Sequence, residues 1–220
     1  MPLTPFQESV AKLLSVDRSP DSYLAGGAAM HIAPGSERFS NDLDYFHDSV
    51  ERVASAFSAD RALLENSGFT LEISLQQTGI VRSVVKKGSE ATKVDWAHDA
   101  AWRFLPSLPH PIAGYVLQPV DLAVNKLLAL VGRDEPRDFI DIMFAHRNVL
   151  ALGALCWAAA GKDPGFTPPL LLDLLRRRGR IRPEDLARLH LLTLPDLEAR
   201  KREWLEALDG AEAFIAGRPP

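Results

Sequence analysis

The chain has 220 residues, of which 46% are hydrophobic and 25% charged, and its formal net charge is −4. These values are typical of a soluble globular protein with one domain or two small ones. The acidic balance excludes a surface that attracts nucleic acid everywhere, so any such contact must come from a local patch. The single cysteine, Cys156, excludes an internal disulfide and fits the reducing cytoplasm. The longest apolar run, residues 149–160, is too short to cross a bilayer, and the N-terminal stretch lacks the apolar core of a signal peptide.

The first predicted element is a helix that begins after Thr4. Thr4 is a good N-cap, Pro5 suits the first helical position, and Gln7 completes the capping pattern. We expect this helix to end between Asp17 and Pro20.

The residues from Tyr23 to Asp48 contain a glycine pair. A short apolar run ends at Gly26-Gly27, and the small residues that follow, 28–33, predict one or two helical turns. Backbone N–H groups can approach an anion closely at a glycine pair, because no Cβ is in the way. The sequence therefore predicts a turn that could accept a phosphate.

Further along the same stretch, Asp42, Leu43 and Asp44 alternate acid, apolar, acid. In a strand this alternation places both carboxylates on one face, about 7 Å apart, where they repel each other. A hard cation such as Mg²⁺, which takes oxygen ligands, would remove that repulsion. Metal-binding carboxylates beside a phosphate-accepting turn are the parts needed to handle a nucleoside triphosphate. Either motif alone is more often an ordinary turn.

A helix and three strands are predicted next. Asp48 to Glu51 has the pattern of a capping box for a helix that ends near Asn66. Three β-rich runs follow, over residues 69–76, 80–86 and 91–97.

The third of these runs contains an acid in a position where strands disfavour one. Val94 and Trp96 would point to one face of the strand, and Lys93 and Asp95 to the other. Taken alone, Asp95 has the pattern of a solvent-exposed acid on an edge strand.

Residues 100–114 predict a proline-rich loop, residues 115–118 a short last strand, and residues 119–131 a helix. The buried face of this helix would consist of Ala123, Leu127, Leu130 and Val131. Lys126 lies beside that face, so its stem can pack while its ammonium reaches the surface, as in most such lysines.

A turn over residues 132–135 leads to a helix that begins at Pro136. Asp138 and Asp141 fall in its first turns, where the helix dipole alone would favour acids.

The remaining chain predicts further helices, one from Thr167 and a long one over residues 195–215. Arginines concentrate between these two helices, at Arg176, Arg177, Arg178, Arg180, Arg182 and Arg188. Such a cluster is either a solvated face or a patch for nucleic-acid phosphates.

The order of these motifs resembles the signature of the DNA-polymerase-β-like nucleotidyltransferase superfamily, and more narrowly the AbiEii/AbiGii nucleotidyltransferase toxin family. The resemblance rests on the glycine pair, on the R-x-S-x-D-x-D pattern of residues 38–44, and on the stretch NKLLALVGRDEPRDFID at 125–141. It covers residues 23–147.

The resemblance implies an α/β (α+β) nucleotidyltransferase fold, in which a small mixed sheet is followed by a helical C-terminal half. From residue 119 onward the pattern of the chain itself is helical to the end. We therefore expect a catalytic domain over residues 1–118 and a helical domain over residues 119–220 that completes the cleft.

The resemblance also implies a metal site for Mg²⁺. Asp42 and Asp44 would bind the metal ions, and Asp95 would complete the site and help to deprotonate the acceptor. Asp99 is the alternative position for this third acid.

The nucleotide would be held by a second set of residues that the resemblance implies. Gly26, Gly27 and Ser40 would contact the phosphates of the NTP. Lys126 would neutralise the triphosphate, and Asp138 matches an acid that is important in the family.

The implied reaction moves a nucleotidyl group from an NTP to a hydroxyl of an RNA, in the first place the 3′ end of a tRNA. As a toxin, the protein would have an antitoxin as its partner. The alternatives are a small-molecule (aminoglycoside-type) nucleotidyltransferase and kinase-like phosphoryl transfer by the same site. A third alternative, an inactive binding module, is disfavoured by the presence of all three acids.

Overall fold

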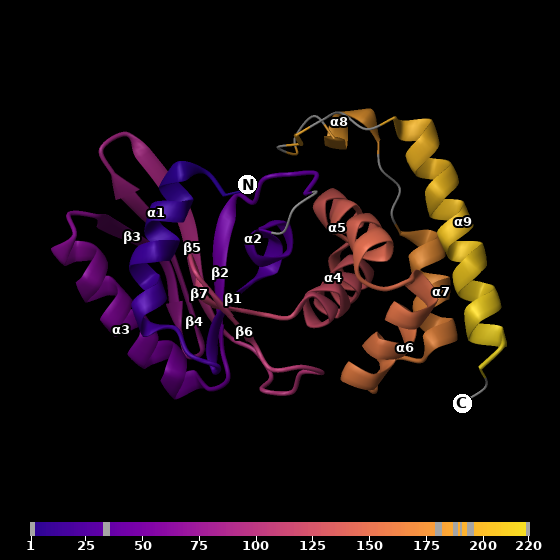
Figure 1. Ribbon diagram of the computed structural model, residues 1–220, viewed down its shortest axis with the longest axis horizontal. Helices are drawn as coiled ribbons and strands as arrows, with labels where there is room; N and C mark the ends of the chain where they lie inside the picture. Colours follow the sequence, from indigo (N-terminus) through magenta and orange to yellow (C-terminus); the bar gives the residue numbers. More distant parts are fainter. Residues whose placement is uncertain are drawn as a thin grey trace. The chain divides into compact units, whose positions relative to one another are not determined.

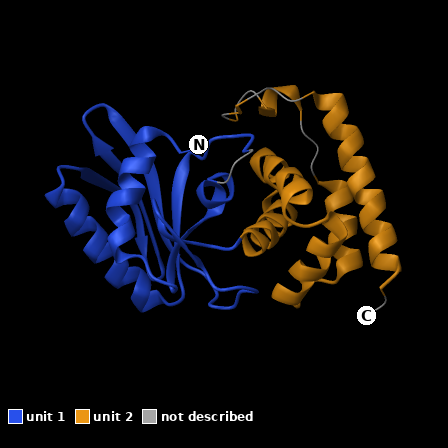
Figure 2. Cartoon of the chain, viewed as in Figure 1, with its two compact units in different colours: residues 1–118 blue, residues 119–220 orange. Residues whose placement is uncertain are grey.

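The computed structural model describes residues 3–32, 36–178, 182–186, 189, 191–192 and 196–218. The chain forms two compact units, Met1–Gln118 and Pro119–Pro220 (Figure 2). Unit 1 mixes strands with helices, whereas the described elements of unit 2 are helices (Figure 1). The mixed α/β class with a helical C-terminal half is therefore confirmed.

Unit 1 is built on a mixed sheet that has seven strands among the described residues, in the order β3-β4-β5-β2-β1-β7-β6 (Figure 1). The strands are β1 (Ser22–Ala25), β2 (Asp42–His47), β3 (Thr70–Gln77), β4 (Ile80–Lys87), β5 (Glu90–His98), β6 (Leu108–His110) and β7 (Gly114–Val116). The neighbours β2 and β5 are parallel, as are β1 and β7, and the other neighbours are antiparallel.

One strand of this sheet, β6, lies inside the segment for which the sequence predicts only a loop. It pairs with β7 at the edge of the sheet and contains Pro109. An edge strand tolerates proline because one side of its backbone needs no partner strand. A strand of three residues also shows no alternation that could be detected.

The helices of unit 1 are α1 (Pro5–Leu14), the 3₁₀ turn η1 (Ser15–Asp17), α2 (Gly26–His31) and α3 (Val50–Asn66). The capping box of α1 is confirmed, since Thr4 and Gln7 exchange two hydrogen bonds of 3.1 and 3.0 Å. For α3 the predicted capping box, which runs from Asp48 to Glu51, is wrong by one residue. Ser49 is the N-cap and accepts from the backbone N–H of Arg52, so no acid occupies the third helical position.

One face of the sheet is buried under α1 and α3, because alternate residues of the strands are apolar. Leu43 and Tyr45 of β2 and Val94 and Trp96 of β5 are fully buried on this face, as the alternation predicts. The residues between them on β2 and β5 point to the opposite face.

A buried ion pair connects the layers of unit 1. Arg18 donates to both carboxylate oxygens of Asp60 at 2.6 and 2.7 Å, and neither side chain has exposed surface. The indole of Trp96 donates to the same carboxylate at 2.7 Å, and the guanidinium of Arg18 lies 4.8 Å from the centre of the Tyr45 ring. These contacts join α3, β5, β2 and the segment before β1.

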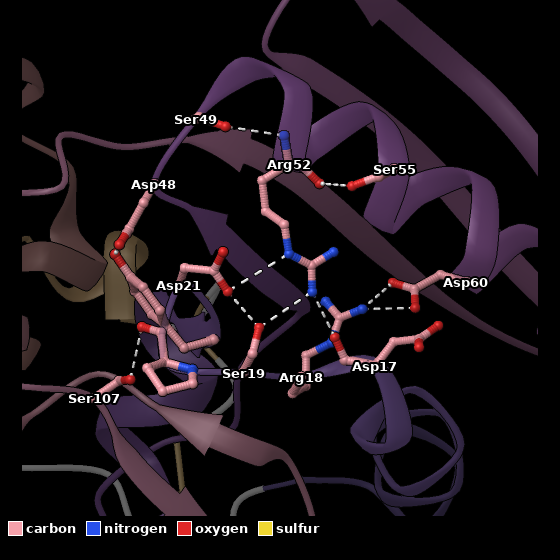
Figure 3. A network of polar contacts seen from close by, with 12 residues as sticks. Asp17, Arg18, Ser19, Asp21, Asp48, Ser49, Arg52, Ser55, Asp60 and Ser107 are labelled. Carbon is pink, nitrogen blue, oxygen red and sulfur yellow. Dashed lines mark hydrogen bonds and ion pairs between the residues drawn. The ribbon is translucent and has the colours of Figure 1, made fainter.

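Figure 3 shows a second group of polar contacts around the same segment. The guanidinium of Arg52 donates to the carbonyl of Asp17 at 2.8 Å and to the hydroxyl of Ser19 at 3.2 Å, and it pairs with Asp21 at 3.6 Å. The start of α3 thus holds the residues that lead into β1.

Unit 2 contains the helices α4 (Pro119–Arg133), α5 (Pro136–Asn148), α6 (Leu152–Lys162), α7 (Pro168–Arg177), α8 (Pro183–Leu186) and α9 (Leu197–Ala216). The predicted stripe of α4, formed by Ala123, Leu127, Leu130 and Val131, is buried. The predicted start of the last helix at residue 195 lies outside the described residues, and α9 is capped by the side chain of Asp196.

Cys156 is buried, which raises the pKa of its thiol to about 12 and leaves it protonated.

Among the described residues, no single helix is long and apolar enough to cross a membrane. Only when α5 and α6 are taken together are they long and apolar enough, and the chain bends by 112° between the two helices.

The buried pair in unit 1 generates a stability prediction. Asp60→Asn keeps the shape of the side chain but leaves the Arg18 charge without its carboxylate. We expect the free energy of unfolding, measured with urea, to fall by about 3–5 kcal/mol. The control is Glu65→Gln, which removes an ion pair of 2.8 Å with Arg61 whose side chains are about half exposed. It should cost less than about 1 kcal/mol. Equal losses in both variants would contradict the role given to the buried pair.

Candidate functional site

The predicted acids of unit 1 lie on one face of the sheet, opposite to α1 and α3. Asp42 and Asp44 are both half-buried and alternate with the buried Leu43 on β2. The parallel register of β2 with β5 sets Asp44 directly opposite Asp95 and Asp42 opposite Lys93. Paired residues of neighbouring strands share a face, about 5 Å apart. The structure therefore brings the three predicted acids together.

The glycine pair adjoins these acids because β1, which leads into it, is the other neighbour of β2. Ala25, the last residue of β1, is opposite Asp44. The chain then turns at Gly26, with φ of +61°, directly into α2. A Cβ at Gly26 would lie 1.8 Å from a carboxylate oxygen of Asp44. Only glycine permits both this backbone conformation and this close approach.

The second glycine lies against two polar side chains of the segment before β2. A Cβ at Gly27 would lie 2.7 Å from a guanidinium nitrogen of Arg38 and 3.0 Å from the hydroxyl of Ser40. Both side chains are buried, and the Ser40 hydroxyl donates to a carboxylate oxygen of Asp42 at 3.0 Å. Ser40 therefore connects the glycine turn to the acidic pair.

The third acid has a cation as its neighbour. The Nε of Arg82, on β4, donates to the carboxylate of Asp95 at 2.9 Å. Burial raises the pKa of Asp95, against the opposing effect of Arg82, and the charge of Asp42 adds to the rise. The alternative acid, Asp99, follows the end of β5 and uses its carboxylate to accept from the backbone N–H of Ala100. Asp95 is thus the acid that faces Asp44.

The donor set suits a hard divalent cation that is shared with a substrate. Among the described residues, no group of three or more His, Cys, Asp or Glu side chains is arranged to hold a metal by itself. Mg²⁺ is commonly bound by one or two carboxylates, and the phosphates of the substrate complete its shell. Asp42 and Asp44 fit that pattern, since both are carboxylates on one face beside a glycine turn.

The candidate residues of unit 2 form a separate buried cluster. The ammonium of Lys126 lies 2.8 Å from Asp141 and 3.4 Å from Asp138, and both acids are fully buried. Arg133 donates to both oxygens of Asp138 at 2.6 and 2.9 Å. The expectation that Lys126 extends its ammonium to the surface is wrong, because its side chain is only 10% exposed. Two acids one helical turn apart on α5 hold it inside the unit.

The arginines of the predicted patch are largely engaged by acids. Arg176 pairs with Glu212 at 2.7 Å, Arg178 with Asp134 at 3.5 Å, and Arg182 with Asp185 at 3.0 Å. Arg180 and Arg188 lie outside the described residues. A cavity of about 540 Å³ in unit 2 is lined mostly by apolar side chains, and its walls also carry Arg176, Arg178, Arg200, Lys201 and the acid Glu198.

Two cations near the acids were missed by sequence reasoning. Arg38 belongs to the R-x-S-x-D-x-D pattern, but nothing in that pattern shows that its guanidinium lies against Gly27. Arg82 could have been found by counting back from the turn between β4 and β5, where Lys87 pairs with Glu90. The same register places Arg82 opposite Asp95.

Comparison with solved structures shows the same fold in three bacterial proteins. MenT4, a nucleotidyltransferase toxin from Mycobacterium tuberculosis, aligns with a TM-score of 0.62 and 16% identity over 97% of this chain and 82% of its own. A Helicobacter pylori protein, provisionally described as a nucleotidyltransferase, gives 0.59 and 17% over 98% of this chain and 96% of its own. JHP933 from H. pylori gives 0.56 and 19% over 95% of this chain and 91% of its own.

Sequence comparison identifies the family. No curated protein matches the chain in sequence. The model of the AbiEii nucleotidyltransferase toxins of type IV toxin–antitoxin systems matches residues 13–214, which is nearly the whole chain. The chain therefore belongs to the AbiEii family of nucleotidyltransferase toxins, and it is a nucleotidyltransferase.

Proposed function

We propose that the protein moves a nucleotidyl group from an NTP to a hydroxyl of an RNA acceptor and uses Mg²⁺ bound by Asp42 and Asp44. The observation that supports this most is the group of three carboxylates on one sheet face beside the Gly26-Gly27 turn. In the reaction, a bond forms between the acceptor oxygen and the α-phosphorus of the NTP. The bond from that phosphorus to the leaving pyrophosphate breaks.

The metal ion would neutralise charge on the triphosphate and activate the attacking hydroxyl. Asp42 and Asp44 hold it through their carboxylates, and the Ser40 hydroxyl orients Asp42. Asp95 completes the metal site and receives the proton of the acceptor hydroxyl.

The triphosphate would be held by backbone and side-chain donors. The turn at Gly26 and Gly27 offers N–H groups without a Cβ in the way, and Ser40 adds a hydroxyl. Lys126 would neutralise the charge that develops on the leaving group, for which its ammonium has to exchange the buried carboxylates of Asp141 and Asp138 for the phosphates. In this proposal residues 1–118 form the catalytic domain.

The acceptor would be RNA, with the 3′ end of a tRNA as the first candidate. The phosphates would be bound by the basic side chains on the walls of the cavity in unit 2, Arg176, Arg178, Arg200 and Lys201, after the three arginines leave the acids with which they pair. These side chains would contact backbone phosphates and not the edges of the bases, so the affinity for RNA should fall steeply as the salt concentration rises. Modified tRNA would stop translation, which is a route to toxicity that an antitoxin would have to counter.

Removal of either metal-binding carboxylate tests the proposal. Asp42→Asn and Asp44→Asn should each lower transfer of label from α-labelled NTPs to total RNA on the order of 100-fold or more, because the metal loses a charged ligand. Asp95→Asn should have a comparable effect, whereas Asp99→Asn should be near wild type. The mass of the labelled products distinguishes nucleotidyl from phosphoryl transfer.

Expression of the same variants in cells tests whether a tRNA is the acceptor. Wild-type protein expressed without an antitoxin should slow growth and extend tRNA 3′ ends, and the double variant Asp42→Asn, Asp44→Asn should do neither. Normal growth and unmodified tRNA ends with the wild type would remove the tRNA proposal. Undiminished transfer by the single variants would remove the metal assignment.

The close approach of the glycine turn to Asp44 gives a second test. Gly26→Ala places a Cβ where the Asp44 carboxylate lies, and a displacement of about 1 Å at a reacting group lowers turnover on the order of 100-fold. The matched control is Gly88→Ala, which has the same φ of +61° but no atom within 4 Å of the added Cβ. We expect transfer to fail only in Gly26→Ala. Equal activity in both variants would show that Asp44 is not needed at its observed position.

The buried cluster around Lys126 separates a structural role from a role toward the triphosphate. Lys126→Met should lower the free energy of unfolding by about 3–5 kcal/mol, because it removes a cation from two buried carboxylates. The double variant Lys126→Met, Asp141→Asn removes one of those charges as well and should regain most of the stability in a urea titration. Its use of NTP should stay impaired. Recovery of normal NTP dependence in the double variant would show that Lys126 is only structural.

A further inference from the structure

The sheet face of unit 1 opposite to α1 and α3, where α2 packs against β2, carries cations as well as acids. Across the sheet, Arg82 of β4 is opposite Asp95 of β5, and Asp95 is opposite Asp44 of β2. Two residues earlier on β5, on the same face of the sheet, Lys93 is opposite Asp42. Asp95 therefore lies between a guanidinium on one side and a carboxylate on the other.

The ion pair between Arg82 and Asp95 is accessible to an incoming ligand. The side chain of Arg82 is 54% exposed and that of Asp95 is 23% exposed. A pair with this exposure adds little to stability, so it can open when a better partner arrives. The contact joins the Nε of Arg82 to one carboxylate oxygen of Asp95. Arg82 thus has the freedom to leave Asp95 without disturbing the core.

The charge of Arg82 has opposite effects on the two ligands of the proposed reaction. A divalent cation is attracted by the three carboxylates and repelled by Arg82, whereas a triphosphate is attracted by Arg82. In the free protein Arg82 pairs with Asp95. A bare cation is therefore attracted less strongly than it would be by the three carboxylates without Arg82. When the nucleotide is present, Arg82 can exchange its partner from Asp95 to a phosphate.

We propose that Arg82 is a positioning residue that neutralises Asp95 in the free protein and so makes metal binding depend on the nucleotide. This inference rests on the proposed function, because it assumes that Asp42, Asp44 and Asp95 bind the metal. According to this inference, Arg82 couples the binding of the metal to the binding of the nucleotide. By thermodynamic linkage, each ligand must then change the affinity for the other by the same factor.

The test measures binding of each ligand without the other. Free Mn²⁺ is followed by electron paramagnetic resonance in the absence of nucleotide, on the full-length chain. Arg82→Gln should bind Mn²⁺ at least about fivefold more tightly than wild type, a typical size for coupling between two sites. In the presence of EDTA, the same variant should bind a mixture of the four non-hydrolysable ribonucleoside triphosphate analogues more weakly than wild type.

Two controls separate charge from disruption. Arg82→Lys keeps the positive charge and should stay close to wild type in both measurements. Arg61→Gln breaks an ion pair of similar length, 2.8 Å against 2.9 Å for Arg82 with Asp95, on the surface of α3 and should change neither measurement. Equal Mn²⁺ affinity in wild type and Arg82→Gln would overturn the inference, as would an Arg82→Lys variant that behaves like Arg82→Gln.

A further variant distinguishes failure of this inference from failure of the proposed function. Adding Asp42→Asn and Asp44→Asn to Arg82→Gln should abolish Mn²⁺ binding. If Mn²⁺ binding survives in that triple variant, the metal is held elsewhere and the proposed site itself is wrong. If it is abolished while Arg82→Gln alone matches wild type, only the role of Arg82 is wrong.

Discussion

Two carboxylates directly opposite each other on neighbouring strands, Asp44 and Asp95, are the constraint on which the site in unit 1 depends. Like charges in this position are destabilising. The fold tolerates them because Arg82 contacts one and because both lie on the face of the sheet that α1 and α3 leave uncovered. A sheet face that collects negative charge in this way favours a cation, and in this family of nucleotidyltransferases a cation and a triphosphate are the ligands that we propose.

The position of these acids is set by the opposite face of the same strands. Tyr45 and Trp96 alternate with the acids and are fully buried, and Trp96 is fixed by its hydrogen bond to Asp60. Since the side-chain period of a strand is two residues, a slip of one residue would bury the acids and expose the aromatic rings. The buried pair of Arg18 with Asp60 therefore acts on the site indirectly, by holding β5 in the register that sets Asp95 opposite Asp44.

Sequence reasoning recovered the elements whose pattern is local. The capping residues of α1, the hairpin strands and the stripe of α4 follow from local sequence patterns. The hairpin strands and α4 were predicted with nearly their observed bounds, whereas α1 ends at Leu14, before the predicted end between Asp17 and Pro20. Features that depend on contacts between elements, and not on the pattern within one element, were missed. The short edge strand β6 exists only through its pairing with β7, and the burial of Lys126 depends on acids from the next helix. Arg82 was missed although the hairpin register alone places it beside Asp95.

The central claim is that Asp42 and Asp44 bind a divalent metal together with an NTP. A crystal of the protein soaked with Mn²⁺ and a non-hydrolysable NTP analogue tests it directly through the anomalous scattering of manganese. We predict a peak that contacts the carboxylates of both Asp42 and Asp44 and the phosphates of the analogue beside Gly26 and Gly27. A nucleotide bound elsewhere in the chain, or a manganese peak without contact to either carboxylate, would contradict the claim.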